Sequence, residues 1–244
     1  MTRQVRWVVF WLGAAGFGVL AVLAMIRMPG FGSLVHPYRD LAVPLANARS
    51  TPNVVSALNF DQRALDTLIE ETILLGSVVG AAALLRPSDH EREHLATEEG
   101  RTLEATRLLG YLLLPMTLMV GIDVVVHGHL TPGGGFQGGV VLATGVHLLY
   151  VAGSYRTLQK LRPLAWYRLA EALGAGAFVV LGLLGLLVAG GFLVNFLPYG
   201  TSGDLFSSGT VVLLNIAVGI EVASGVIVLL AQFLAQALTV QEIR

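Results

Sequence analysis

The sequence predicts an all-α, polytopic integral membrane protein with about six transmembrane helices. Of its 244 residues, 55% are hydrophobic and only 13% are charged, and the mean hydropathy is +0.72. A soluble domain carries about a quarter charged residues, so this chain has too little polar surface to cover a globule in water. Apolar runs also recur along the whole chain, several of them near the roughly 20 residues that cross a bilayer.

The first predicted span follows Arg3 and Arg6 and is too long for the apolar region of a signal peptide, which has about 7–15 residues. No small-residue cleavage site follows it, so we expect a retained helix. The second span contains Glu70 and Glu71 and is the weakest of the series. The third contains Pro115. The six spans are Trp7–Ile26, Leu65–Leu85, Leu108–Val126, Gly134–Ala152, about Trp166–Val194 and Gly209–Leu234.

The distribution of basic residues supports this topology. With six spans, 11 of the 15 Lys and Arg residues fall on the side that holds both termini. The other four lie in one long loop after the first span. Because cytoplasmic loops carry the excess of Lys and Arg, we expect both termini to face the cytoplasm.

A charged stretch, Arg86–Arg101, separates the first two spans from the last four. Such a run is typical of a solvated linker. We therefore predict a two-helix unit over residues 1–87, a cytoplasmic linker over residues 88–104 and a four-helix unit over residues 105–244. The linker contains His90 and His94, but a third ligand is lacking, so we expect no metal site.

The composition also limits the chemistry of the chain. A net charge of −1 argues against a broadly basic nucleic-acid binder, and we expect no nucleic-acid partner. The absence of cysteine excludes disulfides, iron–sulfur ligation and thiolate catalysis. Haem or zinc bound through histidine stays formally possible, but we expect no cofactor.

The stretch HGHLTPGGGFQGG, His127–Gly139, lies between the third and fourth spans. It contains a formal GxGxxG pattern, which indicates a nucleotide site only where a strand precedes it within a βαβ unit. Apolar spans lie on both sides here and no Walker lysine follows. A nucleotide site is therefore disfavoured.

The glycines instead predict close packing where the fourth span begins. Gly135, Gly139 and Ala143 recur every four residues, so another helix can approach backbone to backbone. Pro132 suits the first turn of that helix. Backbone groups at a glycine-rich helix start can also line a hydrated path, and the two interpretations are compatible. We expect contacts with neighbouring subunits to be shaped by Pro132, Gly133, Gly134, Gly135, Phe136, Gly138 and Gly139.

Acidic side chains within apolar spans are costly and mark ion or proton routes or paired structural sites. Asp66 and Glu70 lie four residues apart and therefore on one helix face. Two ionised carboxylates in proximity repel each other, which suits a site that exchanges a proton or a cation. The alternative is an ordinary acidic first turn at the water interface, favoured by the helix dipole.

Other candidates lie in the later spans. Asp123 and His127 lie four residues apart. They either relay protons or only satisfy each other's hydrogen-bonding groups. His147 continues the register of the small residues, where a lone histidine is more often a packing residue than a relay. Glu221 is the deepest acid of the sixth span, so we expect it to be functional. Glu171 is expected to form a local ion pair with Arg168, three residues earlier.

From Arg107 to the C-terminus the chain resembles the B subunit of the Mrp (Mnh) multisubunit sodium/proton antiporters. The family's GH-x-x-PGGGF-x-GG loop is present as GHLTPGGGFQGG. The last span, TVVLLNIAVGIEVASGVIVLLA, is similar to the family's final helix. The resemblance implies a four-span B-type domain in a prokaryotic cell membrane.

The first half resembles the E-type segment found at the C-terminal end of the family's large A-type chain and as a separate subunit of membrane-bound hydrogenases. The run TPNVVSALNFDQRALDTLIEETILL contains NVV, an Asp and then DT-x-x-E-x-T. In the family, the acid that matches Glu70 is implicated in cation or proton passage. Glu71 stands where the family has an apolar residue. The matching positions are Asp61, Asp66, Thr67, Glu70 and Thr72.

We therefore expect a non-enzymatic membrane subunit of a multisubunit sodium/proton antiporter, with other antiporter subunits, Na⁺, H⁺ and the lipid bilayer as its partners. Related antiporter-like subunits carry an axis of lysines, whereas the single lysine here is Lys160, so the chain is not expected to exchange ions alone. The alternatives are an equivalent subunit of a redox-driven, hydrogenase-type complex and a purely structural assembly subunit. The candidate ion or proton path comprises Glu70, Asp66, Asp61, Glu221, Asp123, His127 and His147.

Overall fold

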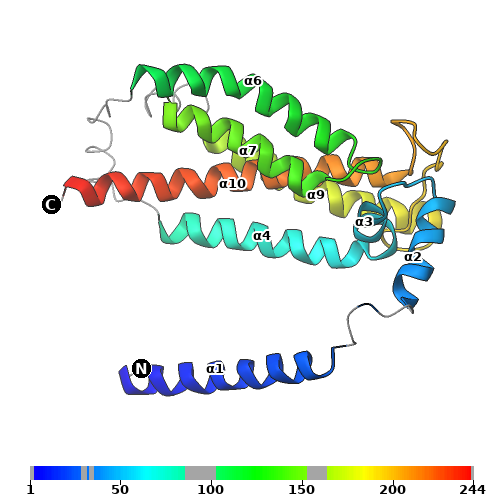
Figure 1. Cartoon of the computed structure of the whole chain (residues 1–244), viewed down its shortest axis with the longest axis horizontal. Helices are drawn as coiled ribbons and strands as arrows, with labels where there is room; N and C mark the ends of the chain where they lie inside the picture. The colour runs from blue at the N-terminus through cyan, green and yellow to red at the C-terminus, as the bar shows by residue number, and fades with distance from the viewer. Residues whose placement is uncertain (1–2, 29–31, 33–35, 86–102, 153–163, 243–244) are drawn as a thin grey trace. The chain divides into compact units, whose positions relative to one another are not determined.

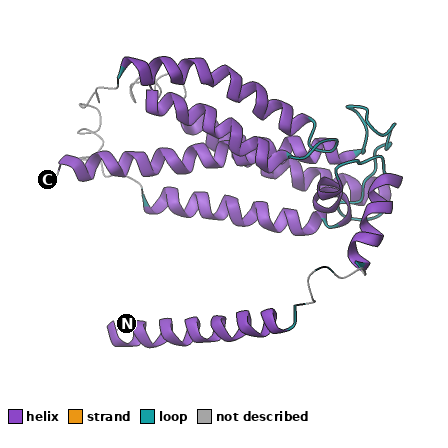
Figure 2. Ribbon diagram, in the orientation of Figure 1, coloured by secondary structure: helices purple, strands orange, loops and turns teal. Residues whose placement is uncertain are grey.

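The computed structural model describes residues 3–28, 32, 36–85, 103–152 and 164–242. Every regular element in these ranges is a helix, which confirms the all-α fold class (Figure 2). The chain forms two compact units, Met1–Asp40 and Leu41–Arg244. The charged stretch Arg86–Arg101, with its two histidines, lies outside the described residues.

The first unit contains α1, Arg3–Ile26. Its 20-residue apolar stretch, Trp7–Ile26, has a mean hydropathy of 2.3 and matches the first predicted span. Helix α2, Pro37–Ala48, begins in this unit and continues into the second. Its first residue is a proline, whose missing N–H costs nothing at that position.

The second unit is a bundle whose described loops lie at one end (Figure 1). We call this the loop end; the opposite end is where α4, α7 and α10 finish and α6 and α9 begin. The helices of this unit are α3, Val54–Ala57; η1, a π-helical turn, Leu58–Gln62; α4, Ala64–Leu84; α6, Glu104–Val126; α7, Gly135–Ala152; α9, Leu164–Ala189; and α10, Thr210–Glu242.

Within the described ranges, five helices are long and apolar enough to cross a membrane, namely α1, α4, α6, α9 and α10. The predicted fourth span is also helical, but its described apolar stretch is shorter, Gly135–Leu149. The fifth span ends at Ala189 rather than Val194, because Gly190 has a φ of +76° and such a left-handed residue ends a helix. The prediction for Pro132 was wrong: it lies in the loop, three residues before α7 begins.

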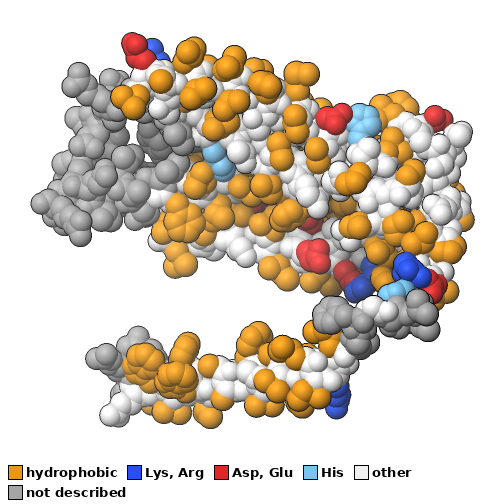
Figure 3. Space-filling model, viewed as in Figure 1, with side chains coloured by type: hydrophobic (Ala, Val, Ile, Leu, Met, Phe, Trp, Pro, Cys, Tyr) orange, Lys and Arg blue, Asp and Glu red, His pale blue; other side chains and the backbone are white. Residues whose placement is uncertain are grey.

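Helix α10 is the centre of the second unit and packs against α7, α9, α4 and α6 (Figure 1). In its apolar stretch 72% of the residues are buried, against 17% in α4 and in α6. The outer helices direct apolar side chains away from α10, and these cover much of the visible face in Figure 3. This arrangement suits a bundle surrounded by lipid or by other membrane subunits.

Helix α4 packs on α10 and α9 and therefore shares a core with the helices that follow the charged stretch. Phe60 and Ala64 contribute to the same buried cluster as Phe178, Leu214 and Val218. The predicted division into a two-helix unit and a four-helix unit stays a prediction from the sequence. The packing itself joins α4 to the later helices.

Candidate functional site

The glycine-rich loop between α6 and α7 is held by Asn53. The Asn53 Nδ2 donates hydrogen bonds to the backbone oxygens of Gly128, at 2.7 Å, and Thr131, at 2.8 Å. The Asn53 backbone N–H donates to the oxygen of His129, at 3.0 Å. The Asn53 Oδ1 accepts from the backbone N–H of Val55 and so caps α3. Asn53 thus connects the start of α3 to the glycine-rich loop before α7.

A second asparagine, Asn215 on α10, holds the start of α7. Its Oδ1 accepts a hydrogen bond from the Gly135 backbone N–H at 2.9 Å, and its Nδ2 donates to the Ser56 Oγ at 3.0 Å. The Asn215 side chain is fully buried, where a lost hydrogen bond is expensive. Sequence reasoning did not single it out, although an asparagine inside an apolar span is itself a signal.

The glycines at the start of α7 allow close helix contacts within this chain. A Cβ placed on Gly135 would lie 2.3 Å from the Asn215 backbone oxygen, and one on Gly139 would lie 2.9 Å from the Gly219 oxygen. Gly138 faces α6, where a Cβ would lie 2.4 Å from a methyl carbon of Val125. The close-packing interpretation is confirmed, with α10 and α6 as the partners.

Not every residue of the loop is used in this packing. Pro132 is exposed, and Phe136 keeps 49% of its surface exposed. Gly133 and Gly134 have φ values of +137° and +144°, which residues with a side chain adopt only with strain. The predicted contact with neighbouring subunits stays a prediction, and the two exposed residues are the ones available for it.

A cavity of about 270 Å³ lies between the glycine-rich loop and α4. We call it the loop-side cavity. Glu70 and Glu71 line it from α4. The Glu70 side chain is exposed, whereas Glu71 is buried with 3% of its surface exposed. The remaining lining residues are Val55, Ser56, Asn59, Phe60, Thr67, Gly133, Gly134, Gly135, Phe136, Gln137 and Val218.

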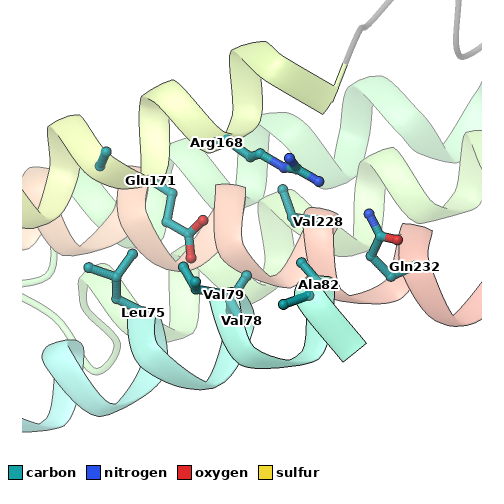
Figure 4. Close-up of a pocket in the computed structure, with 10 residues that line it drawn as sticks. Leu75, Val78, Val79, Ala82, Arg168, Glu171, Val228 and Gln232 are labelled. Carbon is teal, nitrogen blue, oxygen red and sulfur yellow. The ribbon is translucent and has the colours of Figure 1, made fainter. Parts of the chain in front are cut away.

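Three glutamates from three helices are buried inside the second unit. Glu71 on α4 and Glu171 on α9 are each 3% exposed, and Glu221 on α10 is fully buried. The candidate path predicted from the sequence includes Glu221 but not Glu71. The expected ion pair between Glu171 and Arg168 was wrong: the Arg168 side chain extends away from Glu171 (Figure 4), and no ion pair joins these two described residues.

The two other acids near the start of α4 are paired with arginines. The Asp61 carboxylate has no exposed surface and contacts the Arg49 Nη1 at 2.7 Å. This contact raises the pKa of Arg49, and the same guanidinium lies over the ring of Tyr199. Asp66 is half-exposed and forms an ion pair with Arg63. Neither of these two acids lines the loop-side cavity.

Asp123 and His127 contact each other as their spacing predicts. The Asp123 Oδ1 lies 2.9 Å from the His127 Nδ1, and the two side chains are 68% and 39% exposed. This exposure places the pair on the bundle surface, away from the buried glutamates. His147 is half-buried on α7. The structure thus separates these two histidines from the loop-side cavity.

Sequence reasoning overlooked His129, in the glycine-rich loop. Its side chain is fully buried, and its Nε2 lies 3.5 Å from the backbone oxygen of Asp204. Burial lowers the pKa of the His129 imidazole, because the charged form loses its hydration. Burial thus favours the neutral imidazole of His129, whose Nε2 faces the loop before α10.

Comparison with known sequences places half of the chain in a family. Residues 105–228 match the model of a domain related to the MnhB subunit of Na⁺/H⁺ antiporter. An uncharacterized protein of Methanocaldococcus jannaschii is 33% identical over 202 residues, which are 71% of this chain and 74% of that protein. A probable A/B subunit of a K⁺/H⁺ antiporter from Rhizobium meliloti is 24% identical over 204 residues, 72% of this chain but 20% of that relative.

Two solved structures share the fold. A chain of the membrane-bound sulfane sulfur reductase, an archaeal respiratory membrane complex, matches with a TM-score of 0.70 and 27% identity over 94% of this chain and 98% of that one. A chain of the Mrp complex from a Dietzia species matches with a TM-score of 0.68 and 24% identity, over 95% of this chain and 26% of that one. The chain therefore belongs to the family of membrane domains related to the MnhB subunit of Na⁺/H⁺ antiporter.

Proposed function

We propose that this chain is a non-enzymatic membrane subunit of a multisubunit sodium/proton antiporter, in which it contributes to the ion or proton path and to assembly. The observation that carries this proposal is the loop-side cavity, where Glu70 and Glu71 face a backbone held in place by two asparagines. The family of domains related to MnhB and the probable K⁺/H⁺ antiporter relative support it.

The chemistry of the loop-side cavity suits a small cation or a proton. Glu70 is an exposed carboxylate on its wall, and Gly133 and Gly134 present backbone groups without side chains. Carboxylate and carbonyl oxygens are the ligands that hard cations prefer. A cavity that opens beside such groups lets an ion or proton enter from the loop end of the bundle.

We place the chain in a prokaryotic cell membrane with both termini in the cytoplasm, because the basic residues favour that side. Other antiporter subunits would bind around Pro132 and Phe136, the exposed residues of the glycine-rich loop. Such contacts would bring the loop-side cavity next to a neighbouring chain.

The test is to replace Glu70 by Gln and by Ala and to measure sodium-dependent proton movement in vesicles that contain the assembled complex. Both variants should lower the exchange rate, because neither restores the exposed Glu70 carboxylate on the wall of the loop-side cavity. Glu104→Gln is the matched control, since Glu104 is exposed on the first turn of α6. Wild-type rates in both Glu70 variants, with all subunits present, would remove Glu70 from the path.

A second candidate is the equivalent subunit of a redox-driven complex, because the sulfane sulfur reductase chain matches almost end to end. Gentle detergent extraction distinguishes the two, since a redox-driven complex brings iron–sulfur proteins that this cysteine-free chain cannot replace. A third candidate is a purely structural subunit. It would be favoured if substitution of each buried acid disturbed assembly alone.

A further inference from the structure

Two cavities lie on opposite sides of the buried glutamates. The loop-side cavity has Glu71 and Val218 in its wall. A second cavity of about 530 Å³, here called the distal cavity, lies farther from the loop end between α4, α9 and α10 (Figure 4). Its lining residues include Leu75, Val78, Arg168, Glu171, Val228 and Gln232.

The order of residues along α10 places Glu221 between the two cavities. Val218 lines the loop-side cavity and Val228 lines the distal one, and a rise of about 1.5 Å per residue separates them by about 15 Å. Glu221 lies in this interval, about 4.5 Å along the axis from Val218. Its carboxyl interacts electrostatically with both Glu71 and Glu171.

Two glycines bring α9 and α10 together around these acids. A Cβ placed on Gly174 would lie 2.7 Å from the Glu221 backbone nitrogen, and one on Gly225 would lie 3.0 Å from the Glu171 Oε1. The Glu171 carboxyl therefore lies at the level of Gly225, one helical turn beyond Glu221. The three acids form a series along α10, in the order Glu71, Glu221 and Glu171.

Four of the six carboxyl oxygens in this series are buried without a hydrogen-bond partner among the described residues. They are both oxygens of Glu221, the Oε2 of Glu71 and the Oε1 of Glu171. As ions, the three acids would repel one another, and Glu71 and Glu221 would each cost several kcal/mol in an apolar interior. Arg168 offsets part of this cost for Glu171. A bound proton removes the charge from Glu71 or Glu221.

We propose that Glu71, Glu221 and Glu171 form a proton relay that connects the loop-side cavity with the distal cavity. A proton from water in the loop-side cavity binds the Glu71 carboxylate, passes to the Glu221 carboxylate and then to the Glu171 carboxylate. Glu171 releases it to water in the distal cavity, and each donor returns to its ionised form. No bond other than O–H forms or breaks. The relay rests on the proposed function, because it supplies the proton branch of that exchange.

Arg168 favours protons over metal cations in the distal cavity. Its guanidinium lines the cavity together with Glu171 (Figure 4). A fixed positive charge repels a sodium ion that enters from the same water. A neutral carboxylic acid, in contrast, can still exchange its proton with that water. The described residues also include no three acidic or histidine side chains placed to hold one metal ion.

The transport test compares Glu221→Gln, Glu221→Asp and the control Glu104→Gln in the complete complex reconstituted into vesicles. Gln cannot carry the proton, so Glu221→Gln should lower sodium-driven proton movement by about tenfold or more. Glu221→Asp should retain part of the rate, because it restores an ionisable group. A wild-type rate in Glu221→Gln with all subunits present overturns the relay.

Infrared absorption of protonated carboxyl groups supplies a readout that does not depend on transport. The wild-type complex near neutral pH should show a protonated carboxyl that exchanges in D₂O and is lost in Glu221→Gln or Glu171→Gln. Absence of any such group from the wild-type complex overturns the relay, even where a variant fails to assemble. If wild-type vesicles show no exchange at all, the proposed function fails, and the infrared result still decides the relay.

Discussion

At the scale of single residues, the site depends on side chains whose partners lie far away in the sequence. Asn53 and Asn215 bind backbone groups of the glycine-rich loop from positions about 80 residues distant. Glu171 lies three residues after Arg168, which favoured a local ion pair, whereas tertiary packing turns it toward α4 and α10 (Figure 4). Single-sequence reasoning identifies polar residues in apolar spans but not their partners, because those partners come from other helices.

The buried Asp61 carboxylate depends on Arg49. We expect Asp61→Asn to lower the free energy of unfolding by about 1.5–3 kcal/mol, the usual worth of a hydrogen bond to a charged group. The measurement is thermal unfolding in detergent. Asp40→Asn is the control, because Asp40 pairs with Arg39 on an exposed surface and should change little. Equal effects of the two substitutions would contradict a structural role for the Arg49–Asp61 pair.

The buried His129 makes stability depend on pH. The folded state disfavours the imidazolium, whereas the unfolded chain binds a proton near the ordinary pKa of 6.5. Below that pH the unfolded state therefore holds more protons, and the free energy of unfolding falls by up to about 1.4 kcal/mol per pH unit. The contribution is complete above pH 6.5 and is lost as the pH decreases.

Unfolding temperatures at about pH 7.5 and about pH 5.5 test this dependence. The His129→Gln variant should show a smaller difference between the two conditions than the wild type. His36→Gln is the control, because His36 is exposed. An unchanged difference in His129→Gln would show that His129 is not the group responsible.

At the scale of elements, helix positions were predictable and their contacts only partly so. Hydropathy placed every long helix, because crossing a bilayer requires a long apolar run. The short helices α2 and α3 and the π-helical turn η1 were not predicted, since they lie in a loop that carries no periodic apolar pattern. That segment contains Asn53 and Asp61, and its Asn59 backbone oxygen accepts a hydrogen bond from the Thr67 Oγ1 of α4 at 2.7 Å.

The contact between α7 and α10 depends on Gly135. Gly135→Ala should destabilise the bundle by about 1–3 kcal/mol, because the added Cβ meets the Asn215 backbone oxygen, which cannot move like a side chain. Gly176→Ala on α9 is the matched control, since nothing lies within 4 Å of its added Cβ. Unfolding temperatures in detergent should fall for the first variant only. Because Ala is the better helix former, helix propensity does not explain a fall, and a comparable fall in both variants would contradict a specific packing role for Gly135.

At the scale of the whole molecule, the fold class and the family could be predicted from composition and one loop motif. The series of buried acids could not be predicted in this way, because it depends on how α4, α9 and α10 pack against one another. Glu71 stands where the family has an apolar residue, yet it lies in the wall of the loop-side cavity and interacts with Glu221. Only the packed bundle shows that three isolated sequence positions belong to one series.

The proposed function requires a complex that is driven by ion gradients rather than by electron transfer. The most direct measurement is the pH inside vesicles that contain the intact wild-type complex, after a sodium gradient is imposed with no electron donor present. In a gradient-driven exchanger, protons should move promptly in the direction opposite to sodium. Proton movement that appears only when an electron donor is supplied would contradict the proposed function and would assign the chain to a redox-driven complex.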